Sequence, residues 1–324
     1  MSEGNPAGAT PLIIDCDPGI DDAVSIAMAV ASPELDLRGI TTVAGNASLS
    51  TTTRNARALL AALGSSGVPV APGASRSLVR NPPPYPPIHG DNGLGGVRLD
   101  PPADPPAARP ASALELFADV LGPAERRSVT LLALGPLTNI ALLAATRPDL
   151  LERVERLIVM GGSTDRGNIT PVAEFNVWVD PEAARRVLCP PALELCLVGL
   201  NVTRGATIDD AGLARLGACS LAGGRLAKMI TGYADLGQDG WPLHDVAIVT
   251  AALEPGLLVT RPATIEVDTG AGPSRAQTVC EFDEAPAFLS LRDDPELPSR
   301  ARVAVELDRK LFREMLFERI GRLG

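Results

Sequence analysis

The sequence predicts an α/β protein with a doubly wound, mostly parallel central sheet. Short aliphatic and β-branched runs alternate with Ala-, Leu- and Arg-rich segments of helical periodicity, and this alternation is typical of βαβ units. The strand-like runs are apolar along their whole length, as expected when helices cover both faces of a parallel sheet. At 324 residues the chain can form one large Rossmann-like domain.

Strands and helices are expected to follow one another in order along the chain. The expected strands are Leu12–Asp15, Leu37–Val43, Val129–Leu134, Leu157–Met160 and Leu195–Gly199. The helices expected between them are Asp21–Ala31, Ser50–Leu63, Ala111–Leu121, Thr138–Thr146 and Pro181–Leu188. After Gly240 the pattern predicts a helix, two strands and a closing helix, at His244–Leu253, Thr264–Val267, Arg302–Leu307 and Arg309–Ile320.

Two segments are expected to lack regular structure. Residues 1–10 lack an apolar core pattern, and we expect a disordered lead-in before a single domain that spans residues 11–324. Residues 81–110 hold ten of the thirty prolines, and proline is excluded from helix interiors and central strands. This stretch is therefore predicted to be a long loop, and such loops inside compact domains are usually functional or disordered.

The composition excludes several classes of protein. A hydrophobic content of 45% is enough for a sizeable core, and it excludes wholesale disorder and a collagen-like chain. A net charge of −10 opposes binding to nucleic acid and to anionic lipid. The five cysteines show no C-x-x-C pair, no apolar run is long enough to span a membrane, and the first residues do not resemble a signal peptide. We therefore expect a cytoplasmic protein.

Four aspartates directly after the first expected strand carry the strongest functional signal. They lie in the stretch IDCDPGIDDA, at positions 15, 17, 21 and 22. Like charges this close repel one another unless a cation or hydrogen-bond donors offset the repulsion. The donors are all carboxylates, which favours a hard ion such as Ca²⁺ or Mg²⁺ over zinc. Helix capping on a solvated surface explains Asp21 or Asp22 singly, but hardly all four.

The motif D-x-D-P-G-x-D-D-A resembles the signature of the inosine-uridine-preferring nucleoside hydrolases. Between Pro11 and Val249, further stretches resemble that family in the same order: TTVAGN at 41–46, HG at 89–90, LGPLTN at 134–139, MGG at 160–162, EFN at 174–176 and HD at 244–245. The resemblance implies the nucleoside hydrolase fold and hydrolysis of the N-glycosidic bond of ribonucleosides to ribose and free nucleobase. It also implies a homo-oligomer, either a dimer or a tetramer.

The resemblance further implies a Ca²⁺ ion held by Asp17, by Asp22 in bidentate fashion, by Asp245 and by the main-chain carbonyl of Leu134. Asp17 is expected to act as general base on a water at this ion. His244 is expected to act as general acid and to protonate the departing base, because it is one of only two histidines and lies next to Asp245.

The remaining predicted contacts are with the substrate. The resemblance implies hydrogen bonds to the ribose hydroxyls from Asn168, Glu174 and Asn176. It also implies that Asp21 and the ion contact the 2′ and 3′ hydroxyls. Other residues expected to line the substrate site are Asn46, His89, Met160, Tyr233 and Asp245. Tyr233 and Trp241 are expected either to close over the nucleobase or, for Trp241, to fasten the helix after His244. Asn92 stands where relatives more often have an acidic residue, which puts contacts with the leaving base in doubt.

Two other functions are compatible with parts of the sequence. A phosphatase of the haloacid-dehalogenase type also places D-x-D after a first strand, but the chain has only two lysines, Lys228 and Lys310, to hold a phosphate. A non-catalytic nucleoside- or sugar-binding module with a structural ion would not need Asp17 and His244 as base and acid. The preferred nucleobase does not follow from the sequence.

Overall fold

The computed structural model describes residues 8–83, 88–100, 110–189, 193–233, 240–283 and 301–324. Most of the predicted lead-in, residues 1–7, lies outside this part of the chain. Its last residue, Thr10, was predicted wrongly: it begins the first strand, where its N–H donates to Glu34 O at 2.8 Å and it pairs with Leu35. Two parts of the proline-rich stretch, residues 84–87 and 101–109, are also outside the described residues.

Each expected strand and helix is present, and the structure adds further elements that the sequence did not predict. The strands are β1 (Thr10–Cys16), β2 (Leu35–Thr42), β3 (Val70–Pro72), β4 (Val129–Ala133), β5 (Val154–Met160), β6 (Leu195–Val198), β7 (Thr207–Ile208), β8 (Trp241–Pro242), β9 (Leu258–Val267), β10 (Thr278–Phe282) and β11 (Ala301–Leu307). The first helices are α1 (Ile20–Val30), α2 (Leu49–Ala62), α3 (Ala113–Leu121), α4 (Thr138–Thr146), α5 (Pro148–Leu151), α6 (Phe175–Val179) and α7 (Pro181–Leu188). They are followed by α8 (Leu200–Thr203), α9 (Asp210–Cys219), α10 (Leu221–Ile230), α11 (Val246–Leu253), the 3₁₀ turn η1 (Pro255–Leu257) and α12 (Arg309–Ile320).

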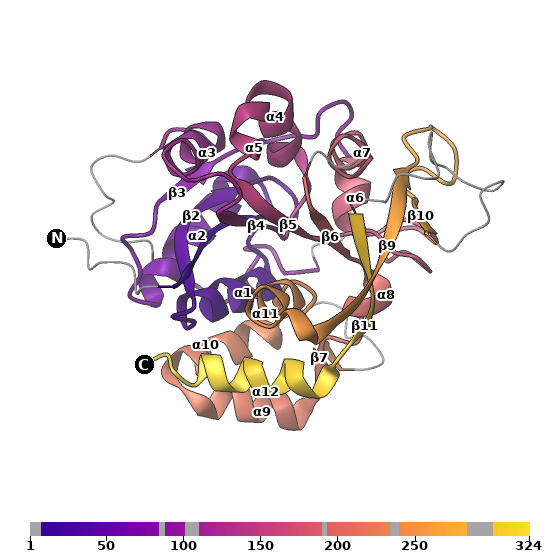
Figure 1. Cartoon of the computed structure of the whole chain (residues 1–324). Coiled ribbons are helices and arrows are strands. Elements are labelled where there is room, and N and C mark those ends of the chain that lie inside the picture. Colours follow the sequence, from indigo (N-terminus) through magenta and orange to yellow (C-terminus); the bar gives the residue numbers. More distant parts are fainter. Residues whose placement is uncertain (1–7, 84–87, 101–109, 190–192, 234–239, 284–300) are drawn as a thin grey trace.

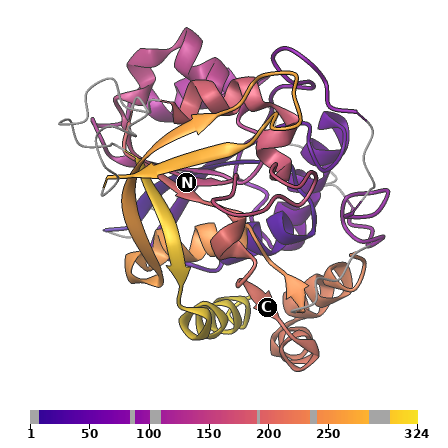
Figure 2. The same cartoon turned by 90° about the vertical axis from the view of Figure 1, so that its right-hand side faces the viewer.

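Nine strands form one sheet in the order β10-β9-β11-β6-β5-β4-β1-β2-β3. The strands from β3 through β6 to β11 pair in parallel, whereas β9 pairs antiparallel with both β10 and β11. Figure 2 shows this antiparallel end of the sheet, with β9 and β10 in orange and β11 in yellow. The sheet is therefore mostly parallel, as predicted. The order reverses between β1 and β4, and ligands of such sheets bind beyond the carboxyl ends of the strands at that switch point.

Helices cover both faces of the sheet, which explains why its central strands β1 and β4 are buried along most of their length. Leu12, Ile14 and Cys16 of β1 belong to one buried cluster, whereas Ile13 between them belongs to another. The second cluster lies against α3, α4 and α7, and the first against α1, α2 and α11. In Figure 1 the two sets of helices lie above and below the sheet, with α9, α10 and α12 in a further layer.

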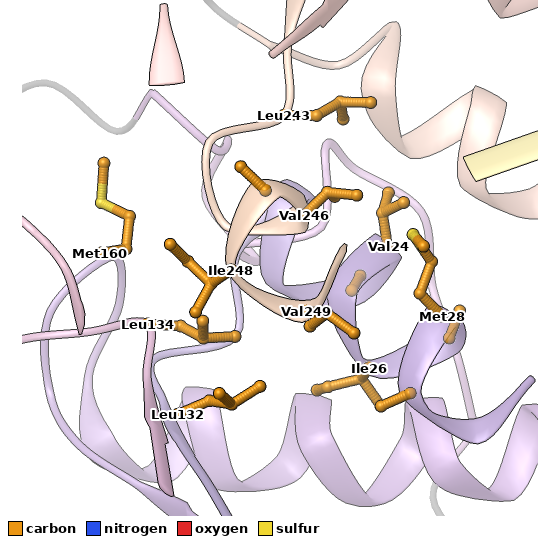
Figure 3. Packing of buried hydrophobic residues seen from close by; sticks show 14 of the residues in the cluster. Val24, Ile26, Met28, Leu132, Leu134, Met160, Leu243, Val246, Ile248 and Val249 are labelled. Carbon is orange, nitrogen blue, oxygen red and sulfur yellow. The ribbon is translucent and has the colours of Figure 1, made fainter. Parts of the chain in front are cut away.

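The core beneath the expected site fixes the helix that follows His244 and Asp245. Val246, Ile248 and Val249 of α11 are fully buried. Figure 3 shows them packed between side chains of α1 and side chains at the ends of β4 and β5, including Leu134 and Met160. Burial of apolar surface contributes roughly 25 cal/mol per Å². This packing therefore stabilises α11 in its position beside the site.

Several element boundaries differ from the expectation. The helix expected at His244–Leu253 begins at Val246, which leaves His244 and Asp245 in the preceding segment. The strand expected at Thr264–Val267 is part of the longer β9. No helix in the described part of the chain is long and apolar enough to cross a membrane.

Candidate active site

The predicted site residues come together at the switch point between β1 and β4. Asp15 lies in β1, and Asp17 follows that strand directly. Asp21 and Asp22 occupy the first turn of α1, where the helix dipole favours negative charge. Leu134 directly follows β4, and its N–H donates to Asp15 O at 2.8 Å. The aspartate motif and the end of β4 therefore lie together at the carboxyl ends of the central strands, as the sequence predicts.

Three carboxylates form a buried cluster that fits a cation. Oxygens of Asp21, Asp22 and Asp245 all lie within 4.8 Å of one another, although Asp245 is more than 220 positions away along the chain. Asp245 precedes α11 but makes no side-chain cap hydrogen bond to it, and its carboxyl instead contacts that of Asp22. The Asp245 side chain therefore does not cap α11, and helix capping does not explain this aspartate. Asp17 is not part of this trio.

Asp17 is held beside the trio by close main-chain contacts. Its Oδ2 accepts from the Asn46 N–H at 2.6 Å, and the Asn46 side chain donates to Asp22 Oδ2 at 3.3 Å. A Cβ atom on Gly135 would lie 2.6 Å from Asp17 Oδ1, and one on Gly45 would collide with Oδ2. Only glycine allows the main chain to approach the carboxylate this closely at both positions. Asn46, predicted only to lie near the ribose, bridges two of the four aspartates.

Burial and mutual repulsion raise the pKa values of these carboxyls. Burial, followed by the charge of Asp21, raises the pKa of Asp22 to about 7. Burial and the charge of Asp22 raise the pKa of Asp17 well above its usual range, and burial with Asp21 and Asp22 does the same for Asp245. Such groups hold their charge at neutral pH when a cation balances it.

Two carboxylate oxygens in this group lack a hydrogen-bond donor in the described part of the chain. Asp17 Oδ1 and Asp22 Oδ1 are buried and accept no hydrogen bond from the described residues. An unsatisfied buried carboxylate oxygen is costly, and a bound ion offsets that cost. Because every donor is an oxygen, the residues present fit a hard cation such as Ca²⁺.

Asp15 plays a different part from the other three aspartates of the motif. Its Oδ1 accepts from Thr41 Oγ1 at 2.5 Å and from Asn139 Nδ2 at 2.7 Å. Asn139 also donates to Thr42 O at 3.1 Å and accepts from the Ala74 N–H at 2.8 Å. One amide thus joins β1, β2 and the residues after β3 beneath the site.

Glu174 accepts three main-chain hydrogen bonds in this structure. Its two oxygens accept from the N–H groups of Gly162, Asn176 and Val177 at 2.9, 2.8 and 3.1 Å. Glu174 is therefore the N-cap of α6, a helix that the sequence did not predict. Burial nevertheless raises its pKa to about 7, against the opposing effect of these three donors.

The other two predicted ribose contacts differ in exposure. Asn176 is buried and donates from Nδ2 to Leu134 O at 2.7 Å and to Met160 O at 3.1 Å. The Leu134 carbonyl expected to bind the ion therefore already accepts one hydrogen bond, but a carbonyl oxygen has two lone pairs. Asn168 is exposed, and its Oδ1 accepts from the Phe175 N–H at 3.0 Å.

Both histidines lie near Asp21, as expected for residues that line one site. His244 Nδ1 lies 3.0 Å from Thr203 Oγ1. Burial lowers the pKa of His244, although the charge of Asp21 opposes this shift. His89 Nδ1 accepts from the Ile20 N–H at 3.0 Å and lies 3.9 Å from Asp21 Oδ1. This bond from the start of α1 requires His89 Nδ1 to be unprotonated.

The two aromatic residues before His244 have different surroundings. Tyr233 is buried, and its ring centroid lies 5.3 Å from that of His89 at an interplanar angle of 56°. Burial, followed by the charge of Asp21, raises the pKa of its hydroxyl well above the usual range. Trp241 lies in β8 and donates from Nε1 to Asp210 Oδ1 at 3.0 Å, so it fastens that strand to the start of α9. The segment between them, residues 234–239, is outside the described residues.

Asn92 has a structural part in the loop that carries His89. Its Nδ2 donates to Val97 O at 2.7 Å, and its Oδ1 accepts from the N–H groups of Leu94 and Gly96 at 3.0 and 2.9 Å. Asn55 of α2 ties this loop to the aspartate motif, because its Nδ2 donates to both Asn92 O and Pro18 O. Asn92 thus organises the loop from within.

Sequence reasoning missed several polar residues that hold the site. They are Thr41, Asn55, Asn139 and Thr203. Thr41 and Asn139 stand in the TTVAGN and LGPLTN stretches and so carried a signal, but Asn55 and Thr203 meet their partners 37 and 41 positions away along the chain. Nothing local in the sequence marks such contacts.

Comparison with known proteins agrees with this geometry. A family model described as "Inosine-uridine preferring nucleoside hydrolase" matches residues 12–314. The chain is 38% identical to the non-specific ribonucleoside hydrolase RihC of Escherichia coli, covering 95% of this chain and 97% of that protein. It is 36% identical to the pyrimidine-specific ribonucleoside hydrolase RihA of an Enterobacter species, covering 98% and 99%.

A solved structure agrees as well. The purine-preferring ribonucleoside hydrolase from Gardnerella vaginalis superposes with a TM-score of 0.85 at 29% identity, covering 96% of this chain and 98% of that one. With the sheet order and the buried carboxylates at its switch point, these matches assign the family. The chain is an enzyme that belongs to the inosine-uridine preferring nucleoside hydrolase family.

Proposed function

We propose that this enzyme hydrolyses the N-glycosidic bond of ribonucleosides and releases ribose and the free nucleobase. The observation that carries the proposal is the buried group of Asp17, Asp21, Asp22 and Asp245 beside His244 at the switch point. It combines carboxylates that suit a cation and a cationic sugar with a residue that can deliver a proton. The names of the similar hydrolases support the same reaction class.

Asp22 and Asp245 are the residues best suited to hold a Ca²⁺ ion, with Asp17 and the Leu134 carbonyl as further ligands. A bound cation would make a neighbouring water more acidic and orient it toward the substrate. The Oδ1 atoms of Asp17 and Asp22 that lack protein donors support this assignment. Asp21 completes the trio, and it can serve either the cation or a ribose hydroxyl.

Asp17 acts as the general base. Its Oδ2 is committed to the Asn46 N–H, so Oδ1 is the atom that takes a proton from the attacking water, with the lone pair that a bound cation would leave free. Gly45 and Gly135 hold the carboxylate in one place by their close approach. A fixed base within hydrogen-bond reach of its proton contributes typically ~10²–10⁴-fold in rate.

The sugar is bound among carboxylates because the glycosidic carbon becomes positively charged as the base departs. Asp21 and the exposed Asn168 can contact ribose hydroxyls directly. Glu174 and Asn176 are more deeply buried and already bonded to main-chain groups. They hold α6 and the ends of β4 and β5 in place. A hydrogen bond from either residue to a ribose hydroxyl would be formed in addition to these main-chain bonds.

His244 protonates the leaving base. The Nε2–H bond of its imidazolium breaks as a nitrogen of the base gains the proton and the glycosidic bond opens. His89 and Tyr233 both lie near Asp21, with their ring centroids 5.3 Å apart, and can contact the base. His89 can only donate from Nε2, because its Nδ1 accepts the Ile20 N–H.

Incubation of the purified protein with inosine, uridine and p-nitrophenyl phosphate, each alone, tests the proposal. We expect equal amounts of free ribose and free base from at least one nucleoside and no phosphate from the ester. Release of phosphate would instead support the haloacid-dehalogenase alternative. Tight binding of nucleosides without any release of ribose would support a binding module. The same panel, extended to other bases, gives the base preference.

A further inference from the structure

Thr203 touches the proposed general acid but belongs to none of the motifs that predict the site. It is fully buried at the end of α8, and its Oγ1 lies 3.0 Å from His244 Nδ1. We propose that Thr203 is a positioning residue that orients the His244 ring so that Nε2 faces the leaving base. This inference rests on the proposed function, because it concerns how that reaction obtains its proton.

Both ends of this contact are fixed by the fold. The Thr203 N–H donates to Gly199 O at 3.0 Å, and the Asn201 side chain donates to Ala304 O of β11 at 2.9 Å. On the other side, the Leu243 N–H donates to Ala206 O at 2.9 Å, immediately before His244. The hydroxyl and the imidazole are therefore carried by segments that main-chain bonds hold together, so a hydrogen bond between them costs little further ordering.

The contact decides which ring nitrogen is available to the substrate. A hydroxyl can donate or accept, so Thr203 can remain bonded to Nδ1 while the proton on the other nitrogen is transferred. The two ring nitrogens lie on opposite sides of the ring, and Nδ1 toward Thr203 places Nε2 on the side away from it. During the reaction the Nδ1 proton stays, the Nε2–H bond breaks, and an N–H bond forms on the leaving base.

Asp245 supports the orientation from the next position in the chain. Its carboxyl contacts Asp22, which fixes the backbone beside His244 relative to the cluster. In the described part of the chain the ring contacts Thr203 in two ways, through the hydroxyl at Nδ1 and through a hydrogen bond to the Thr203 main chain. Removal of the hydroxyl should therefore loosen the orientation of the ring, which keeps only its main-chain bond, without disturbing the carboxylates.

Leaving-group dependence distinguishes orientation of an acid from general support of the structure. A natural nucleoside needs its base protonated, whereas p-nitrophenyl riboside departs as a phenolate with little help. A residue that only stabilises the fold would affect both substrates equally. A residue that aims the acid would affect the nucleoside alone.

We would measure kcat and KM for the best natural ribonucleoside and for p-nitrophenyl riboside with wild type and four variants. Thr203→Val removes the hydroxyl at nearly constant volume, and Thr203→Ser retains it. Thr250→Val is the matched control, because Thr250 is also a buried threonine but its Oγ1 donates to Val246 O within α11. His244→Ala gives the effect of losing the acid altogether.

Thr203→Val is expected to lower kcat for the nucleoside by about 10²-fold, the usual cost of misplacing a reacting group, with KM little changed. Hydrolysis of p-nitrophenyl riboside should change by less than about 3-fold, since its rate does not use the acid. Thr203→Ser should restore most of the nucleoside rate, and Thr250→Val should match wild type with both substrates. Equal slowing of both substrates by Thr203→Val, or no slowing of either, would overturn the inference.

A spectroscopic measurement covers the case in which Thr203→Val folds poorly. The chain has only two histidines, so ¹⁵N-histidine labelling gives one pair of ring nitrogens for each. Removing the hydroxyl, in Thr203→Val or in the smaller Thr203→Ala, should shift the His244 ring nitrogens and leave those of His89 unchanged, whereas Thr203→Ser should leave both near their wild-type positions. Unchanged His244 signals would refute the contact. If wild type hydrolyses neither riboside, the proposed function fails, which is a different result from any of these.

Discussion

Replacement of Gly135 by alanine tests whether the position of Asp17 controls the reaction. A Cβ atom at residue 135 would lie 2.6 Å from Asp17 Oδ1, whereas ordinary contact begins at 3.4 Å. The carboxylate or the main chain must therefore yield by about 0.8 Å. Oδ1 is the atom proposed to take the proton from water, and a misplacement of about 1 Å can cost ~10²-fold in rate. We expect Gly135→Ala to lower kcat/KM for a nucleoside by roughly 30- to 100-fold.

The assay is steady-state release of ribose at a temperature where the variant is folded. Overpacking costs typically 1–3 kcal/mol, so the midpoint of thermal unfolding should fall by several degrees and must be measured alongside. Gly67→Ala is the control, because a Cβ there meets nothing within 4 Å. Wild-type kcat/KM in Gly135→Ala would refute the reasoning, since it would mean that the position of Asp17 Oδ1 is not critical.

Three further predictions concern the ion, the sugar and a buried acid. The protein should purify with bound calcium and lose activity on exhaustive chelation, and Asp22→Ala should lose both metal and activity; full activity without metal by elemental analysis would contradict this. Adenosine and 2′-deoxyadenosine should differ greatly in kcat/KM, because a site built to bind a hydroxyl rejects its absence by up to ~10⁴–10⁵-fold; comparable turnover would contradict the ribose site. The pKa of Glu174 is about 7 when folded and 4.5 ordinarily, so the folded protein binds the extra proton and the stability it provides is lost as pH rises from 4.5 through 7. The melting temperature of wild type relative to Glu174→Gln should fall across that range, and a constant difference would contradict the shift.

The architecture could be predicted from the sequence because the apolar runs and the helical repeats of apolar residues coincide with the buried strands and helices. The strands β1, β4 and β5 are buried on both faces and are therefore visible as continuous apolar runs. The three-residue β3 ends in a proline, and α6 has only five residues, so neither is long enough to show a period. The pair α9 and α10 escaped prediction because four of the 20 residues in these two helices are glycines.

For the site, the sequence identified residues whose chemistry is unusual but not the residues that hold them. Four aspartates in eight positions and two histidines in the whole chain stand out by composition. Asn55, Asn139 and Thr203 do not, because their roles depend on hydrogen-bond partners that only the fold brings close. Glu174 shows the opposite situation. The sequence singled it out for sugar binding, but no sequence pattern revealed the three main-chain hydrogen bonds that it accepts.

The central claim is that Asp17 and His244 divide the work between activation of water and protonation of the base. It is tested most directly by kcat/KM for Asp17→Ala and His244→Ala, each with the preferred nucleoside and with p-nitrophenyl riboside. Asp17→Ala should damage both reactions, because every leaving group requires an activated water. His244→Ala should lower nucleoside hydrolysis by ~10²–10⁴-fold and largely spare the phenolate. Equal slowing of the two substrates in His244→Ala would contradict the account, and the proton donor would then have to be sought at Tyr233 or His89.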